Sequence, residues 1–166
     1  MKKIFETERL MLREFTQKDA AFVLQLVNSP SWLKFIGDRN ITTIEVATQY
    51  IKNNLMLSYE INYFGLWLVS LKDTGIPIGM CGLVNRDYLE NIDIGFALLP
   101  KYERKGYMYE ATKATMNYGK KVIGIDKIVA ITDTKNVASI GLLNKIGLQF
   151  EKKLQLSDDD IILLFS

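Results

Sequence analysis

The segment from Tyr102 to Ala111, Tyr-Glu-Arg-Lys-Gly-Tyr-Met-Tyr-Glu-Ala, contains the residues whose types and spacing point most directly to chemistry. It lies between an expected strand and an expected helix, and a loop that enters a helix presents unpaired backbone N–H groups and the positive end of the helix dipole. Such a loop binds phosphate, since Arg104 and Lys105 add positive charge and Gly106 lets a ligand approach the backbone. The same pattern is also typical of an ordinary solvated loop with a glycine hinge.

Two residue types that dominate enzyme chemistry are scarce in this chain. There is no histidine, which excludes His-based triads, His-ligated metals and imidazole acid–base catalysis. A single cysteine, Cys81, allows neither an intrachain disulfide nor a zinc cluster, so we expect no metal site. Cys81 lies in the middle of an expected strand, between Met80 and Gly82, and no histidine is present to lower its pKa. We therefore expect it to pack as a small hydrophobic residue and not to act as a nucleophile.

Length and composition indicate one globular domain covering residues 1–166, with 48% hydrophobic and 24% charged residues. The net charge of +2 is too close to zero to indicate a nucleic-acid or membrane partner. The N-terminal segment Met1–Glu6 meets charged residues before any apolar run long enough for a signal peptide, and no stretch approaches the ~18 apolar residues of a membrane span. A cytoplasmic location is therefore expected.

The elements that must position the loop follow from hydrophobic periodicity, capping residues and turn signals. The expected strands cover residues 9–15, 63–71, 76–84, 92–99, 127–132, 148–156 and 161–165. The expected helices cover residues 20–27, 43–59, 107–122 and 136–146. This order predicts an α/β or α+β layered domain with a mixed central sheet.

Five short motifs follow one another along the chain between residue 8 and about residue 150, and their order and spacing are informative. They are Glu8–Arg13 followed by Asp19, Ile78–Leu83, Asp93–Leu98, Arg104–Ala111, and Asn136–Ser139 with Leu143–Leu148. Together they resemble the GNAT superfamily of acyl-coenzyme-A-dependent N-acetyltransferases, especially the branch of ribosomal-protein N-terminal acetyltransferases. The resemblance implies a mixed, mostly antiparallel central sheet flanked by helices. It also implies that the fourth and fifth expected strands, 92–99 and 127–132, splay apart.

The resemblance also implies how acetyl-coenzyme A, the cosubstrate, is held. Its pantetheine arm would lie in the gap between the splayed strands, against the backbone of Phe96, Ala97 and Leu98, because an unpaired strand edge is a template for pairing. The residues expected to bind its pyrophosphate are Arg104, Lys105, Gly106, Tyr107, Met108 and Tyr109. Asn136 and Ser139 would reach the other side of the cosubstrate, although Asn136 also fits a helix N-cap and both roles can hold together.

Catalytic roles follow less directly, because the chain departs from the family pattern. Glu103 replaces a Gln or Arg, and we expect its side chain to face solvent, away from phosphate. Leu143 stands where many members have the tyrosine that protonates the leaving thiolate. That role is therefore unassigned, and Ser139, a nearby tyrosine or water could serve. Asp93 matches a position that is the general base in some members, and it also fits a charge on the sheet surface.

The expected reaction is transfer of an acetyl group to a primary amine, on a protein N-terminus or a small molecule, by direct attack in a ternary complex. The alternative is a coenzyme-A-binding sensor or interaction module that has lost the chemistry. The segment from Trp32 to Asn40 and the helix from Thr43 are expected to shape the acceptor pocket, with the aromatics Trp32, Phe35, Tyr59 and Tyr63. Nothing in the sequence decides between a monomer and a homodimer.

Overall fold

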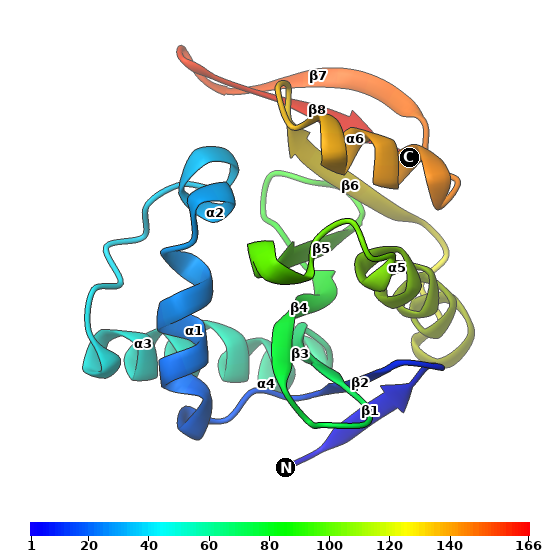
Figure 1. Cartoon of the computed structure of the whole chain (residues 1–166). Helices are drawn as coiled ribbons and strands as arrows, with labels where there is room; N and C mark the ends of the chain where they lie inside the picture. The colour runs from blue at the N-terminus through cyan, green and yellow to red at the C-terminus, as the bar shows by residue number, and fades with distance from the viewer.

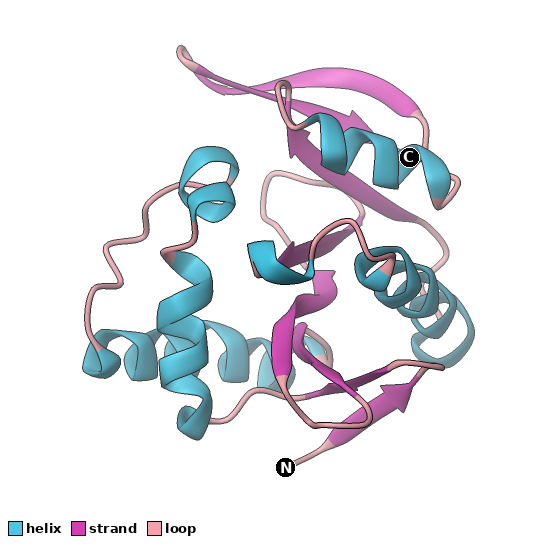
Figure 2. Ribbon diagram, in the orientation of Figure 1, coloured by secondary structure: helices cyan, strands magenta, loops and turns pink.

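A computed structural model describes residues 1–166, and its centre is an eight-stranded sheet (Figures 1 and 2). In spatial order the strands are β1-β2-β3-β4-β5-β6-β8-β7. Their bounds are β1 Lys3–Glu6, β2 Leu10–Arg13, β3 Leu66–Leu71, β4 Pro77–Val84, β5 Ile92–Leu98, β6 Ile128–Asp133, β7 Phe150–Ser157 and β8 Asp160–Phe165.

Every neighbouring pair of strands is antiparallel except β5 and β6, which are parallel. This parallel pair is very short. Ile92 lies opposite Ile128 and Asp93 opposite Val129, and beyond these two pairs the strands separate. The expected mixed, mostly antiparallel sheet is confirmed, and β5 and β6 are the two strands expected to splay.

The helices lie on both faces of this sheet (Figure 2). Their bounds are α1 Ala20–Val27, α2 Pro30–Phe35, α3 Ile44–Tyr50, α4 Leu57–Asn62, α5 Tyr107–Tyr118 and α6 Val137–Lys145; a π-helical segment, Ile51–Met56, joins α3 to α4, and another, Gly119–Ile123, extends α5. Capping residues mark several starts. The Thr43 side chain accepts a hydrogen bond from the Val46 N–H at 3.2 Å. No helix combines the length and apolar character needed to cross a membrane.

Two hydrophobic cores lie on opposite faces of the sheet, because neighbouring residues in a strand point to opposite sides. Leu68 lies opposite Met80 in the β3–β4 register, and both pack with α1 and α3. The next pair, Trp67 and Cys81, faces the other core, which α5 and α6 cover. The alternation along β3 and β4 thus holds both helical layers to one sheet.

Two elements were not expected from the sequence. The strand β1 is short and half exposed, and α2 has only 6 residues, so neither has enough periodicity to be recognised. Ser29 and Pro30 are suitable N-cap and first-turn residues and were the available signal for α2. The helical segment from Ile44 continues to Asn62, beyond the expected end near Tyr59, and stops at Tyr63 with a left-handed φ of 64°.

Gly82 permits the closest backbone approach in the sheet. A Cβ atom at this position would lie 2.0 Å from the Gly65 carbonyl oxygen and 2.7 Å from Leu66 Cα. The Gly65 carbonyl in turn accepts a hydrogen bond from the Leu83 N–H at 3.1 Å. A side chain at residue 82 would therefore push the start of β3 away from β4.

We predict that Gly82→Ala lowers the free energy of unfolding by about 3 kcal/mol, the upper end for overpacking a core. The matched control is Gly95→Ala on the opposing strand, where the nearest atom to a new Cβ is Leu66 Cδ2 at 3.2 Å, a side-chain atom that can move. We expect a loss of under about 1 kcal/mol there. Urea denaturation measures the free energy of unfolding of both variants. Equal losses would contradict the close backbone approach inferred at Gly82.

Candidate functional site

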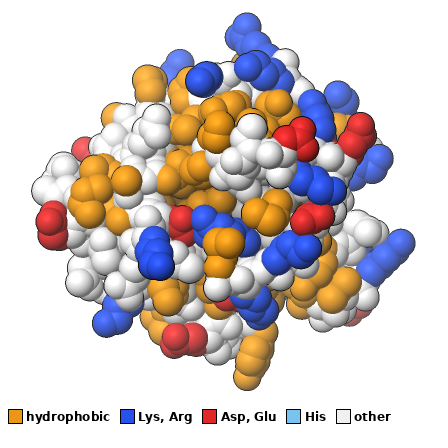
Figure 3. All heavy atoms as spheres, turned by 60° about the horizontal axis from the view of Figure 1, so that its bottom comes forward, with side chains coloured by type: hydrophobic (Ala, Val, Ile, Leu, Met, Phe, Trp, Pro, Cys, Tyr) orange, Lys and Arg blue, Asp and Glu red, His pale blue; other side chains and the backbone are white.

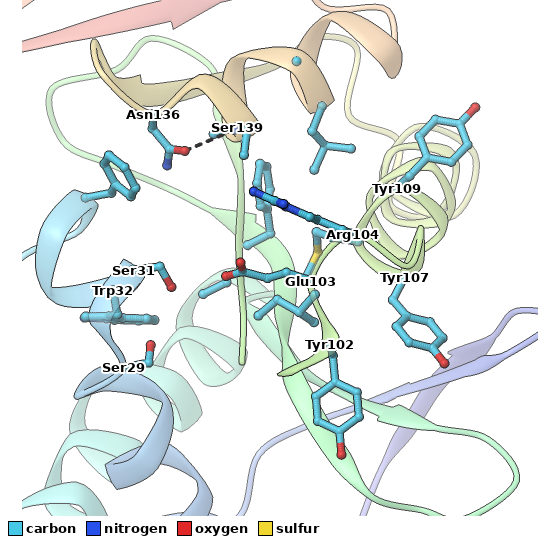
Figure 4. A pocket seen from close by; sticks show the side chains of 18 of the residues that line it. Ser29, Ser31, Trp32, Tyr102, Glu103, Arg104, Tyr107, Tyr109, Asn136 and Ser139 are labelled. Atoms are coloured by element: carbon cyan, nitrogen blue, oxygen red, sulfur yellow. Dashed lines mark hydrogen bonds between the residues drawn. The ribbon is translucent and has the colours of Figure 1, made fainter. Parts of the chain in front are cut away.

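The first candidate site is a cavity of about 430 Å³ where the splayed strand β5 meets α2, α5 and α6 (Figure 4). Its lining includes residues from each of these elements and from the loop before α5. The lining residues are Ser29, Ser31, Trp32, Phe35, Ile36, Phe96, Ala97, Leu98, Tyr102, Glu103, Arg104, Gly106, Tyr107, Met108, Tyr109, Asn136, Ala138, Ser139, Gly141, Leu142 and Lys145.

The loop that enters α5 presents a continuous set of free backbone donors. Among the backbone hydrogen bonds outside regular elements, the Glu110 N–H donates to the Gly106 carbonyl at 3.1 Å, and none is donated by residues 104–109. Arg104 and Gly106 both have left-handed backbones, with φ of 60° and 78°. Six successive N–H groups therefore remain free at the positive end of α5, an arrangement suited to an anion.

Positive side chains surround this loop. Arg104 extends across the cavity toward α6 in Figure 4. The ammonium groups of Lys113 and Lys145 lie 5.8 and 4.5 Å from the ring centroid of Tyr109, which lines the cavity. On the face shown in Figure 3, Lys and Arg side chains lie along the upper and right edges and also nearer the centre, among exposed hydrophobic side chains. The rim near Tyr109 therefore favours an anionic ligand.

Asn136 and Ser139 lie at the start of α6, on the far side of the cavity from the loop (Figure 4). The Asn136 side-chain oxygen accepts a hydrogen bond from the Ser139 N–H at 3.2 Å, so Asn136 is an N-cap. It also lines the cavity, as does Ser139. The capping role therefore leaves both side chains available to a ligand. Leu143, one turn further along α6, is fully buried in the core.

A second cavity of about 330 Å³ adjoins the first. The residues that line both cavities are Trp32, Ile36, Phe96, Ala97, Asn136 and Ser139. The second cavity is bounded further by Arg39, Tyr50, Arg86, Tyr88 and the carboxylates Asp93, Asp133 and Asp160. Two compartments thus meet at the splayed end of β5, one with free N–H donors and one with carboxylates.

Asp93 is the most perturbed carboxylate of the site, with only 1% of its surface exposed. The Arg86 Nε–H donates to Asp93 Oδ2 at 2.7 Å, and Oδ1 has no hydrogen-bond partner. Burial raises the pKa of Asp93 to about 6, although the Arg86 charge and the nearby Ile131 N–H act to lower it. Asp93 is therefore a buried group whose proton affinity lies near neutral pH.

Most of the residues expected to bind the cosubstrate lie together in the first cavity. They are Phe96, Ala97, Leu98, Arg104, Gly106, Tyr107, Met108, Tyr109, Asn136 and Ser139. Lys105 does not line it, and its ammonium group lies 5.8 Å from the Tyr102 ring centroid. Glu103 is exposed as expected, but its carboxylate also borders the cavity, on the side of Ser31 and Trp32 (Figure 4).

The expected acceptor aromatics divide into two groups. Trp32 and Phe35 line the first cavity, and Trp32 also lines the second. Tyr59 and Tyr63 line neither cavity. The Tyr59 hydroxyl is bonded inside the fold, donating to the Leu66 carbonyl and accepting from the Phe15 N–H. The Tyr63 side chain is 88% exposed.

Arg39 and Tyr50 of the second cavity lie in the two segments that were expected to shape the acceptor pocket, whereas Arg86, which also bounds this cavity, lies outside every expected segment. Arg86 follows β4 in a loop whose sequence has no periodicity, so no local signal connects it to Asp93. The Trp32 indole N–H is a further unexpected feature, because it is buried without a hydrogen-bond partner between the two cavities.

Cys81 lies outside both cavities, fully buried in β4. Its sulfur is 3.4 Å from the Thr115 hydroxyl, the only polar contact that it makes. Burial raises the pKa of the Cys81 thiol to about 12, so it is protonated at neutral pH. The geometry supports the expected packing role.

Comparison with known proteins agrees with this architecture. The acetyltransferase (GNAT) domain matches residues 9–149. The chain is 30% identical, over 92% of its length and 86% of the relative's, to the uncharacterized N-acetyltransferase YoaA of Bacillus subtilis. It is 22% identical, over 86% of its length and 74% of the relative's, to the spermidine N(1)-acetyltransferase of Escherichia coli.

Among solved structures, the RimL ribosomal L7/L12 alpha-N-protein acetyltransferase in complex with coenzyme A aligns with a TM-score of 0.74 at 15% identity, over 99% of this chain and 96% of that one. The fold and the matched domain define an acetyltransferase. The chain belongs to the GNAT family, and it is an N-acetyltransferase. The cosubstrate that this fold implies is acetyl-coenzyme A.

We predict that Cys81 does not react with a thiol reagent such as Ellman's reagent in the native protein, because its thiol is buried and protonated. One equivalent should react once the protein is unfolded in guanidinium, which serves as the positive control. We also expect Cys81→Ala to fold, with a stability loss of about 1–2 kcal/mol from the small void. Rapid stoichiometric labelling of the native protein would contradict this assignment.

Proposed function

We propose that this protein transfers the acetyl group of acetyl-coenzyme A to a primary amine by direct attack in a ternary complex. The observation that carries the proposal is the run of six free backbone N–H groups at residues 104–109, which opens into the cavity beside the splayed strand β5. A phosphate group and an extended chain are the two ligand features that such a site accommodates together.

The residues of the first cavity suit the pyrophosphate and the pantetheine arm of the cosubstrate. Backbone N–H groups of Arg104–Tyr109 would hold the pyrophosphate, and the Arg104, Lys113 and Lys145 side chains add positive charge near that end. The edge of β5 that faces β6, at Phe96–Leu98, has no strand partner past Asp93 and would pair with the pantetheine arm. The bound cosubstrate would supply the activated acetyl thioester.

The second cavity would hold the acceptor amine. An amine must lose a proton to become a nucleophile, and a base is most effective when its pKa is near the working pH. Asp93 meets this requirement, since its pKa is about 6 and its Oδ1 is free of protein partners. Ser139 lies where the two cavities meet and would relay to the departing thiolate a proton that its hydroxyl regains from the attacking amine nitrogen or from water. Tyr50 and Tyr88 of the second cavity, or a water, are the alternatives for that step.

The acceptor class proposed is a primary amine on a protein N-terminus or a small molecule. Named relatives act on both kinds, a spermidine amine and the N-terminus of ribosomal protein L7/L12. The second cavity contains Asp133 and Asp160 in addition to Asp93, and these carboxylates attract a cationic amine before it is deprotonated. Its volume of about 330 Å³ accommodates the reacting end of either type of acceptor.

We predict that Gly106→Glu weakens acetyl-coenzyme A binding at least about tenfold, equivalent to about 1.4 kcal/mol. The new side chain adds a like charge near the phosphates, strains the left-handed backbone of the loop and lies against Arg9, since a Cβ at residue 106 would be 3.3 Å from Arg9 Nη2. Isothermal titration calorimetry on the folded variant measures the change.

Gly75→Glu is the matched control for this experiment. Gly75 also has a left-handed backbone, with a φ of 71°, and no atom lies within 4 Å of a new Cβ. It occupies the turn between β3 and β4. The control therefore carries the same charge and the same backbone strain, and its affinity for acetyl-coenzyme A should be unchanged. Equal affinities of the two variants would refute the pyrophosphate placement.

For catalysis we predict that Asp93→Asn lowers kcat at least about 100-fold, the usual contribution of a general base. The wild-type kcat/KM should rise as the pH increases through about 6, because Asp93 accepts a proton only when ionised. In Arg86→Gln this rise of kcat/KM should move to higher pH, since the Arg86 charge lowers the pKa of Asp93. Release of coenzyme A with a panel of primary amines and free-N-terminal peptides measures the kcat of Asp93→Asn and the pH profiles of the wild type and of Arg86→Gln. An Asp93→Asn enzyme with normal turnover and an unaltered pH profile would eliminate this role.

A further inference from the structure

We propose that Arg9 is a positioning residue that holds the loop before α5 in its anion-binding conformation, with Glu110 as its anchor. This inference rests on the proposed function, because it concerns the loop that would bind the pyrophosphate. Arg9 lies just before β2 and Glu110 in the first turn of α5, and 101 positions of sequence separate them. The two residues bind the start of the chain to the phosphate loop.

The Glu110 carboxylate holds both the backbone N–H and the side chain of Arg9. The Glu110 carboxylate accepts a hydrogen bond from the Arg9 N–H at 2.8 Å and one from Arg9 Nε at 2.6 Å. A third comes from the Thr7 hydroxyl at 2.6 Å. These three donors orient the carboxylate, so the guanidinium has a defined position although 43% of the Arg9 side chain is exposed.

From that position the guanidinium contacts three successive residues of the loop and helix start. Its Nη1 donates to the Lys105 carbonyl at 3.0 Å, and its central carbon lies 4.5 Å from the Tyr107 ring centroid. Its Nη2 lies 3.3 Å from where a Cβ on Gly106 would be. Arg9 therefore packs along the side of the loop at Lys105, Gly106 and Tyr107.

The bond to the Lys105 carbonyl determines the direction of a ligand-binding donor. In a trans peptide the carbonyl of one residue and the N–H of the next point in opposite directions. Arg9 holds the Lys105 carbonyl toward itself, so the Gly106 N–H must point away from Arg9. That N–H is one of the six that have no backbone partner. A single side chain thus orients a central donor of the loop.

The loop needs such support because its conformation is unfavourable without it. Arg104 has a left-handed φ of 60°, which a non-glycine side chain adopts reluctantly. The convergent free N–H groups also repel one another until an anion binds. Arg9 is not among the residues that line the cavity, and Glu110 offsets its charge. It therefore acts on the ligand through the loop and not by direct contact.

The test compares two ligands that differ in the pyrophosphate. Coenzyme A is titrated directly by calorimetry, and pantetheine, which lacks the nucleotide and its phosphates, is measured by competition against it. We expect Arg9→Gln to weaken coenzyme A binding about tenfold, the effect of one charge-assisted hydrogen bond. Pantetheine affinity should stay within about twofold, inside the usual effect of a surface change. An equal loss for both ligands would show a merely structural role and overturn the proposal.

Glu110→Gln separates positioning from direct charge attraction. If Arg9 positions the loop, weakening its anchor lowers coenzyme A affinity in this variant too. If Arg9 attracted the phosphates itself, removing the Glu110 charge would raise the affinity, and that result would overturn the proposal. Arg9→Lys keeps the charge but cannot bond Glu110 and the Lys105 carbonyl in the same geometry, so we expect it to behave like Arg9→Gln. Full affinity in Arg9→Lys would also overturn it.

Lys72→Gln is the matched control, because Lys72 is a cation of the same sheet region whose ammonium group pairs with Glu6, at 3.3 Å, and not with the loop. Its affinity for coenzyme A should equal that of the wild type. Failure of the proposed function is recognised separately, because the wild-type protein would then not bind coenzyme A at all. Wild-type binding with unchanged affinity in Arg9→Gln would overturn the positioning role alone.

Discussion

The strands β5 and β6 pair in parallel only at Ile92–Ile128 and Asp93–Val129, and the rest of the site depends on the point where this pairing stops. Past it, β5 continues against β4 and β6 continues against β8, so the two halves of the sheet diverge. Each strand is left with an edge of unpaired backbone groups, which a ligand can satisfy. Both cavities open at this fork.

The position of Asp93 follows from the same constraint. It belongs to the last parallel pair, so its side chain lies at the base of the fork, where the sheet still excludes water. Burial there raises the pKa of the carboxyl, and Arg86 keeps the group compatible with the interior by supplying one charged hydrogen bond. Its Oδ1 is buried without a hydrogen-bond partner, and Asp93 is one of the residues that line the second cavity. A single topological feature thus creates both the opening and a group of perturbed basicity inside it.

Several features could be predicted from local sequence because they depend on local physics. The continuously apolar and buried runs of β3 and β4, the N-cap at Asn136 and the stop of α6 near Gly147 are properties of short segments. The free donors before α5 follow from the way any helix begins, together with a glycine that accepts a left-handed backbone. The strand β1 and the helix α2 were missed, since each is too short for periodicity to show. Trp32 of α2 nevertheless borders both cavities.

The sequence by itself determined the order of the main elements, the buried role of Cys81 and the loop around Gly106, because periodicity, composition and helix ends are read within a few residues. Only the tertiary structure decided which side chains meet. It turned Lys105 out of the cavity, placed Arg86 on Asp93, and brought Arg9 to Glu110 across 101 positions of chain. Such contacts depend on how the sheet and the helices place each segment, and no local pattern carries that information, whether the partners are separated by 7 positions, as Arg86 and Asp93 are, or by 101, as Arg9 and Glu110 are.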